Sequence, residues 1–186
     1  MRLQFVSPLL HELDVIEAET LACCVWEDVR PMDGLAALCD WRFGGRLSRL
    51  LMTGFFTGRL EEVTLVPGRP GLAVDKLILL GAGPRAGFDE TRFDRIVERL
   101  IGVLDGLSSR SVIVELPGRH AGAITPERAA DRLLEALTAP PPLGLQAAAL
   151  PGRTTATAWT LVEDIGARRH IEQHMVEERR RIRPES

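Results

Sequence analysis

The sequence predicts an α/β protein, a three-layer α/β/α sandwich around a mixed sheet. Apolar runs at 75–83 and 111–119 flank an amphipathic segment at 88–107 whose apolar residues recur with helical spacing. A helical crossover of this kind joins parallel strands, and such strands are buried on both faces. Helix and strand patterns alternate along the rest of the chain, which indicates helices on both sides of one sheet.

The N-terminal third begins with strand patterns. Residues 3–6 form a short apolar run that ends at Ser7-Pro8. Residues 13–17 alternate in polarity, so they either pair with that run or simply lead to the next segment. Residues 19–28 have a continuous apolar centre, as expected for a buried strand. Asp33 is the expected N-cap of a helix whose apolar positions continue to Leu51, with a kink or break at Gly44-Gly45.

The remaining elements follow from turn and cap signals. Residues 62–67 are a predicted strand, and Asp89 or Thr91 can cap the helix at 88–107. Thr125-Pro126 begins another helix, and strands are predicted at 145–150 and 155–162. A charged helix follows from 163 to about 182. We therefore expect a domain of residues 1–162, followed by a charged helix and tail at 163–186.

Composition restricts the possible functions. The chain has 186 residues, 45% of them hydrophobic, a net charge of −3, one lysine and no tyrosine, so we expect no nucleic-acid partner. It contains neither an apolar run of about 18 residues nor a signal-peptide pattern, so we expect a cytoplasmic protein without membrane contact. Cys23, Cys24 and Cys39 lack metal-ligand spacing and are expected to be buried. We expect no cofactor and no metal.

Four segments, in this order and spacing, resemble the N-terminal domain of M17 leucyl (cytosol) aminopeptidases. They are Trp26-Glu-Asp-Val-Arg-Pro-Met-Asp-Gly-Leu35, Gly44-Gly-Arg-Leu-Ser-Arg-Leu-Leu51, Gly54-Phe-Phe-Thr-Gly58 and Lys76-Leu-Ile-Leu-Leu-Gly-Ala-Gly83. The resemblance covers roughly residues 19–138. It implies a macro-domain-like fold, which agrees with the architecture inferred from the residue pattern.

The same resemblance implies what is missing. In this family the chemistry resides in a separate C-terminal domain that binds two metal ions and carries an Asn-Thr-Asp-Ala signature, whereas this chain contains no asparagine. No catalytic residue can be carried over, so we expect a free-standing, non-catalytic binding or assembly module. It would contact itself as a homo-oligomer, or bind an aminopeptidase-type protein partner. A weaker alternative is residual or partner-dependent metalloaminopeptidase activity.

A second function remains open, the binding of a nucleotide such as ADP-ribose where the strands end. Open α/β sheets bind ligands outside the carboxyl ends of their strands, and glycine turns there can present backbone N–H groups to phosphate. The candidate residues follow three predicted strands: Asp28, Asp33 and Gly34; Gly81 and Gly83; and Gly118, Arg119, His120 and Gly122. Arg119 could pair with phosphate and His120 could donate a hydrogen bond. A plain turn and an exposed surface loop are the favoured interpretations.

The C-terminal helix offers one further candidate. His170 and His174 are one helical turn apart, a spacing that can ligate zinc, although the order is not His-Glu-x-x-His. A solvated helix face is the favoured interpretation. This helix has few apolar positions, so we expect it either to lie along the domain through Ile171, Met175 and Val176 or to form an oligomer contact.

Overall fold

The computed structural model describes residues 2–139 and 156–182, and six strands of this part form one mixed sheet. Across the sheet the strands are β1 (Arg2–Val6), β6 (Ala158–Val162), β5 (Ser111–Val114), β2 (Ala18–Trp26), β4 (Val74–Gly83) and β3 (Val63–Pro67). Neighbours run parallel except β3, which is antiparallel to β4. The predicted crossover therefore joins two parallel strands, β4 and β5, with β2 between them.

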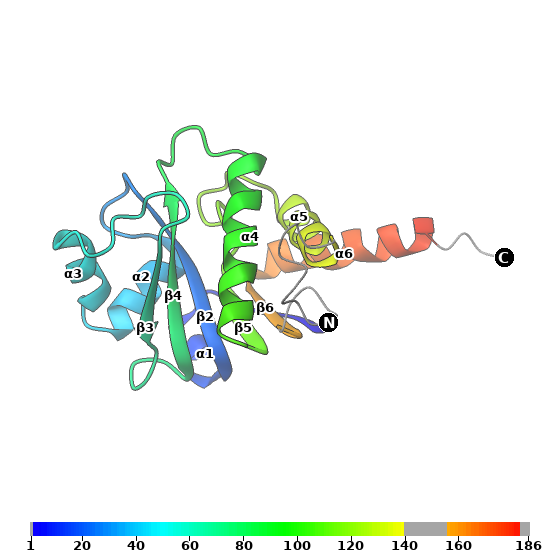
Figure 1. The fold of residues 1–186 in the computed structure, drawn as a ribbon. Coiled ribbons are helices and arrows are strands. Elements are labelled where there is room, and N and C mark those ends of the chain that lie inside the picture. Colours follow the sequence, from blue (N-terminus) through cyan, green and yellow to red (C-terminus); the bar gives the residue numbers. More distant parts are fainter. Residues whose placement is uncertain (1, 140–155, 183–186) are drawn as a thin grey trace.

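Helices cover both faces of this sheet, as predicted. On one face lie α4 (Glu90–Gly106) and α5 (Pro126–Thr138), and on the other lie α1 (Leu10–Val15), α2 (Gly34–Arg42) and α3 (Arg46–Met52). Figure 1 shows α4 in front of the sheet and α2 behind it, with α3 at the outer end. The three-layer α/β/α architecture is therefore confirmed.

Alternation along the central strands builds a separate core on each face. Ile78 and Leu80 of β4 belong to the core beneath α4, whereas Leu77 and Leu79 belong to the core beneath α2. Cys23 and Cys24 are divided between the two cores in the same way. Successive side chains of a strand point to opposite faces, which is why these strands are apolar throughout.

Several local predictions are confirmed. Asp89 caps α4 by accepting a hydrogen bond from the backbone N–H of Arg92, and Gly44-Gly45 separates α2 from α3. Of the two alternatives for residues 13–17, pairing with residues 3–6 does not occur. Residues 10–15 instead form helix α1, which buries Leu13 and connects β1 to β2. The predicted strand at 145–150 lies outside the described residues.

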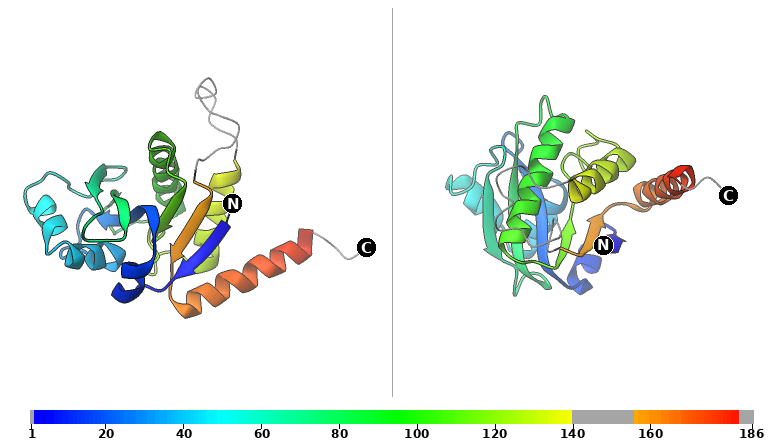
Figure 2. Two further views of the ribbon diagram at one scale, coloured as in Figure 1. Left: turned by 90° about the horizontal axis from the view of Figure 1, so that it is seen from below. Right: turned by 45° about the vertical axis from the view of Figure 1, so that its right-hand side comes forward.

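The C-terminal helix α6 (Ile165–Ile182) packs against α5 and then leaves the body of the domain. Ile171 is fully buried, His174 Nε2 lies 2.9 Å from an Asp131 carboxylate oxygen, and Arg168 stacks over the Phe5 ring of β1. The helix is thus laid along the domain through Ile171, while Val176 is exposed. Figure 2 shows α6 extending outward from the β1–β6 side of the sheet. None of the described helices is long and apolar enough to cross a bilayer.

Candidate functional site

The candidate site lies at the carboxyl ends of the parallel strands β2 and β5, which are neighbours in the sheet. After β2 the chain turns to α2 on one face, and after β5 it turns to α5 on the opposite face. Open α/β sheets commonly bind ligands at a reversal of this kind, outside the carboxyl ends of the strands. The loops after β2, β4 and β5 all reach this point.

A buried carboxylate, Glu115, lies at this end of the sheet. It follows β5 directly, is only 9% exposed, and its Oε2 accepts a hydrogen bond of 3.0 Å from the backbone N–H of Leu35 in the first turn of α2. A Cβ at Gly34 would lie 2.4 Å from that oxygen and 3.0 Å from Cγ of His120. Glycine at 34 therefore allows Glu115 and His120 to approach the start of α2 together.

Burial raises the pKa of Glu115 to about 7, because the charged form loses its hydration. The Leu35 N–H and the charge of Arg119 oppose this rise, whereas the nearby carboxylates of Glu163 and Asp33 add to it. Glu115 therefore changes charge near neutral pH. Because its oxygen already accepts the Leu35 N–H, it occupies the helix terminus at which a phosphate would otherwise bind.

Arg119 is committed to an ion pair inside the protein. Its Nε and Nη2 donate to the two carboxylate oxygens of Glu163 at 2.7 and 2.9 Å, and Nη1 donates to the Ile124 carbonyl at 2.6 Å. The side chains of Arg119 and Glu163 are only 10% and 5% exposed. Arg119 thus links the loop after β5 to the end of β6 and does not project into solvent.

The predicted aspartates contact the loop after β4 through Arg85. The Arg85 backbone N–H donates to Asp28 at 2.8 Å, and its guanidinium lies 3.4 Å from Asp33. Two of the three loops are therefore joined by charge-assisted hydrogen bonds. Because Asp33 is engaged in this way, it occupies the N-cap position of α2 without making a side-chain cap bond.

The predicted glycines have separate structural positions. The amides of Gly81 and Gly83 donate to the carbonyls of Glu62 and Gly58, so both are bonded to the segment before β3. A Cβ at Gly118 would lie 2.5 Å from the Phe88 ring, whereas a Cβ at Gly122 would meet nothing within 4 Å. The structure brings Gly34, Asp33, Arg119 and His120 together at the carboxyl ends of β2 and β5. It places Gly81 and Gly83 in a packed strand end.

Sequence reasoning missed three charged residues of this site: Arg85, Glu115 and Glu163. Glu115 carried a usable signal, because it interrupts the apolar run Ser111-Val-Ile-Val-Glu-Leu with a carboxylate where a buried strand ends. Glu163 looked like the start of a solvated helix. Its burial depends on Arg119, which lies 44 residues earlier in the chain.

The two histidines of the C-terminal helix face α5. His174 pairs with Asp131, and Nδ1 of His170 lies 3.6 Å from Glu127. Both contacts join α6 to α5. Across residues 2–139 and 156–182, no group of three or more His, Cys, Asp or Glu side chains is arranged to hold a metal ion.

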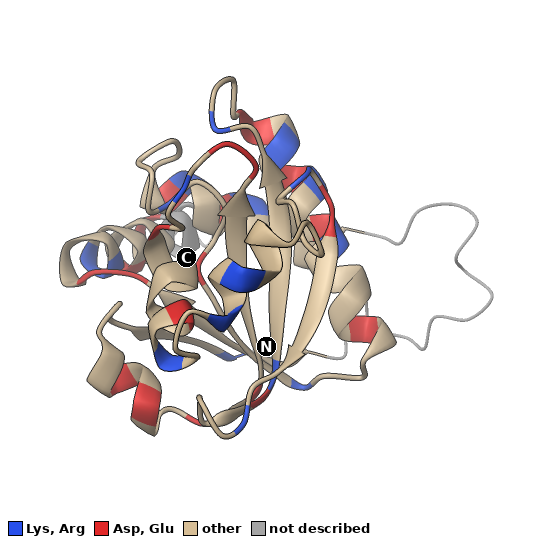
Figure 3. Ribbon diagram, turned by 90° about the vertical axis from the view of Figure 1, so that its left-hand side faces the viewer, with Lys and Arg blue, Asp and Glu red and all other residues tan. Residues whose placement is uncertain are grey.

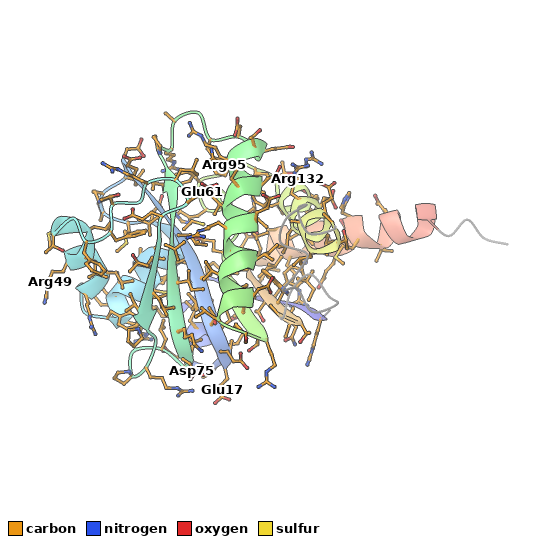
Figure 4. The ribbon with its side chains drawn as sticks, in the orientation of Figure 1. Glu17, Arg49, Glu61, Asp75, Arg95 and Arg132 are labelled. Carbon is orange, nitrogen blue, oxygen red and sulfur yellow. The ribbon has the colours of Figure 1, made fainter. Side chains whose placement is uncertain are left out.

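Two surface hollows lie away from the strand ends. One, of about 420 Å³, is lined by charged side chains, including the Glu61–Arg95 ion pair that Figure 4 labels beside α4. The other, of about 670 Å³, lies between α2 and α3. Its lining consists of Pro31, Met32, Ala37, Asp40, Trp41, Gly44, Gly45 and Ser48. This second hollow is not evident from the sequence, because it depends on how the two short helices are turned against each other.

Comparison with known sequences gives a consistent result. Residues 25–139 match the model of the cytosol aminopeptidase family, N-terminal domain. A probable cytosol aminopeptidase from Tolumonas auensis is 27% identical over 106 residues, which cover 56% of this chain and 21% of that protein. One from Halorhodospira halophila is 30% identical over 88 residues, covering 47% and 18%. The chain therefore spans about a fifth of the length of these relatives.

Solved structures support the same fold. A mutant of tomato leucine aminopeptidase superposes with a TM-score of 0.61 at 13% identity, covering 94% of this chain and 35% of the other. A Trypanosoma brucei macrodomain in complex with ADP-ribose gives a TM-score of 0.68 at 10% identity, covering 94% and 69%. The Mycobacterium tuberculosis DarG macrodomain gives 0.62 at 18% identity, covering 87% and 98%. The predicted macro-domain-like fold is confirmed.

Proposed function

Because this chain belongs to the cytosol aminopeptidase family, matching its N-terminal domain, we propose that it is a non-catalytic binding and assembly module. It would associate with further copies of itself or with an aminopeptidase-type protein. The sequence supports this proposal, since it lacks the asparagine that the family's catalytic signature requires. The relatives are named cytosol aminopeptidases, which supports a cytoplasmic location for this protein.

One observation carries the proposal: large apolar side chains stand exposed at both ends of the domain. Trp41, Met52 and Phe55 are 75%, 78% and 68% exposed at the α3 end, and Ile165 and Val176 of α6 are 64% and 49% exposed. Exposed apolar side chains that cluster mark interaction surfaces more often than chance, whereas isolated ones need no explanation. Trp, Phe and Met are also enriched at protein interfaces.

Size-exclusion chromatography with light scattering tests this proposal, on the chain alone and mixed with a full-length cytosol aminopeptidase. We expect a mass above the monomer's in one of the two samples. Val176→Glu and Phe55→Glu place a charge at either end of the domain and identify the contacting surface. A strict monomer at high concentration that also fails to co-elute with the aminopeptidase would contradict the proposal.

A second candidate is nucleotide binding at the strand ends. The macrodomain solved with ADP-ribose supports it through its fold, and the chain reversal at the carboxyl ends of β2 and β5 supports it through its position. Two contacts weigh against it: Glu115 occupies the first turn of α2, and Arg119 is tied to Glu163. The donors that phosphate would need are therefore already bonded.

Calorimetry with ADP-ribose decides this second candidate. The informative variant is His120→Ala, because His120 is exposed beside Gly34 and takes no part in the buried ion pair. Arg119→Ala serves as a second variant, provided that it folds. Saturable heat that His120→Ala abolishes would support nucleotide binding. No heat at millimolar ligand, or heat that neither variant changes, would count against it.

A further inference from the structure

The surface at the outer end of the molecule combines apolar bulk with positive charge. We define the Trp41 surface as the exposed residues Trp41, Arg46, Arg49, Met52 and Phe55 of α2, α3 and the turn that follows. Figure 4 labels Arg49 at this end, which lies opposite α6. The hollow of about 670 Å³ between α2 and α3 opens beside Trp41.

Helical spacing makes this surface continuous with the hollow. Gly45 and Ser48 line the hollow, and Arg49 and Met52 each lie four residues further along. Residues four apart lie on the same face of a helix, one turn above the other. The hollow therefore leads onto Arg49 and Met52, with Trp41 on its other side.

The two arginines of the surface lack an ion-pair partner among the described residues. Arg46 and Arg49 are exposed, and no carboxylate among the described residues lies within ion-pair distance of either. Asp40 lines the hollow, but its carboxylate is hydrogen-bonded to the start of α3 and not to either arginine. Its oxygens accept hydrogen bonds from the Leu47 and Ser48 amides and from the Ser48 hydroxyl. Figure 3 looks onto this end of the molecule, with arginine positions in blue.

We propose that the Trp41 surface binds an acidic amphipathic segment of a partner protein. Apolar side chains of that segment would cover Trp41, Met52 and Phe55, while its carboxylates pair with Arg46 and Arg49. Tryptophan and arginine are the residue types that most often dominate interface energies, and amphipathic helices commonly dock in surface grooves. This inference rests on the proposed assembly function and specifies the kind of partner.

Charge disfavours a contact of this surface with the same surface of a second copy. In a two-fold symmetric dimer the same patch meets itself, so Arg46 and Arg49 of both copies would face one another. Like charges brought together across an interface oppose binding. A carboxylate-bearing partner gains from the same arginines.

The fluorescence of Trp41 can report whether a peptide has bound to the Trp41 surface. Trp26 and Trp159, the other two tryptophans of the chain, are only 5% and 0% exposed, whereas Trp41 is 75% exposed. Acrylamide added to the full chain will therefore quench mainly Trp41. The probe is a synthetic helical peptide of leucine and glutamate, and the matched control peptide carries lysine in place of glutamate.

We expect the leucine–glutamate peptide to shift the emission to shorter wavelength, protect Trp41 from acrylamide, and saturate. The double variant Arg46→Glu/Arg49→Glu should weaken this binding at least tenfold, as should raising the salt from about 0.05 to 0.5 M, because screening weakens exposed charge pairs. The control variant Arg2→Glu/Arg99→Glu makes the same change in net charge at exposed arginines elsewhere and should bind like the wild type.

Four outcomes would overturn the inference. They are no effect of the leucine–glutamate peptide, equal binding of the lysine peptide, equal weakening by the Arg2/Arg99 control, and protection of Trp41 by oligouridine or by concentrating the protein alone. If the chain assembles in light scattering while Trp41 stays accessible and the peptide has no effect, the assembly function stands and only this inference fails.

Discussion

Arg119 and Glu163 form a bidentate ion pair that fastens the loop after β5 to the end of β6, 44 residues later in the chain. The two hydrogen bonds measure 2.7 and 2.9 Å, and both side chains are nearly inaccessible to solvent. The pair uses the arginine that the sequence offered as a phosphate ligand. It also fixes the point from which α6 departs.

Removing one partner of this pair should be strongly destabilising. Glu163→Gln leaves a buried guanidinium without its counter-charge, which costs about 3–5 kcal/mol of unfolding free energy. Urea denaturation followed by circular dichroism measures the loss. Glu172→Gln removes a carboxylate from the exposed Arg168–Glu172 pair and should cost less than about 1 kcal/mol. Equal losses in the two variants would show that burial of the first pair has no energetic consequence.

The raised pKa of Glu115 predicts an unusual pH dependence. The ordinary value of 4.5 applies to the unfolded chain, and burial raises the folded value to about 7, so the folded state retains a proton that the unfolded chain releases. The stabilisation from this proton is fully present below pH 4.5 and is lost as the pH rises through about 7. Glu115→Gln should therefore be more stable than the wild type at pH 8, by on the order of 3 kcal/mol.

The comparison requires thermal or urea unfolding of both proteins at pH 4.5 and pH 8. The two should be equally stable at the lower pH, because the glutamine still accepts the Leu35 N–H and the protonated glutamate is also neutral. A variant less stable than the wild type at pH 8 would mean that the Glu115 charge is stabilising, and it would refute the assignment.

Glu62 should show the opposite sign. Burial tends to raise its pKa, but hydrogen bonds from the Thr57 hydroxyl and from the Thr57, Gly58 and Arg59 amides outweigh this and lower it. The stabilisation is therefore present above the ordinary pKa and is lost as the pH falls through the folded value. Glu62→Gln should reduce stability at pH 7 by about 1–3 kcal/mol. The loss should shrink toward pH 3, which denaturation curves at both pH values will test.

Two glycine-to-alanine changes should have opposite effects. A Cβ at Gly81 would lie 1.8 Å from the Arg59 carbonyl oxygen, so the strand end would have to move. We expect Gly81→Ala to cost more than about 3 kcal/mol, as for other severe overpacking. Gly102 lies inside α4 with nothing within 4 Å, so Gly102→Ala should stabilise by about 0.5–1 kcal/mol. Similar melting temperatures would disprove the predicted clash.

The docking of α6 depends on one side chain. Ile171 is fully buried beneath the helix, so Ile171→Ala should cost about 2–4 kcal/mol and expose the backbone of α6 to hydrogen exchange. Val176→Ala, one turn beyond and half exposed, should change stability by less than about 0.5 kcal/mol. Unchanged exchange in the Ile171 variant would place the stabilising contacts of α6 elsewhere, such as at His174 and Asp131.

Most elements were predictable because their signals are local. Residues 75–83 are apolar throughout, since β4 is buried on both faces, and the segment at 88–107 repeats its apolar residues every three or four positions, since one side of α4 faces the sheet. The family resemblance depended on the order of such segments. The short helix α1 was not predicted, because six residues contain too few turns to display a helical period.

By itself, the sequence determined the α/β/α class, a cap at Asp89 or Thr91, an interruption at Gly44-Gly45 and the family, because each of these depends on residues close together in the chain. Only the tertiary structure decided that Arg119 forms an ion pair with Glu163 and that Glu115 accepts a hydrogen bond from the first turn of α2. It also left Trp41 exposed beside two arginines that form no ion pair with the part of the chain that the structure describes. These relationships join segments tens of residues apart. Charge pairing and burial across such distances are set by how the layers pack, which no local pattern records.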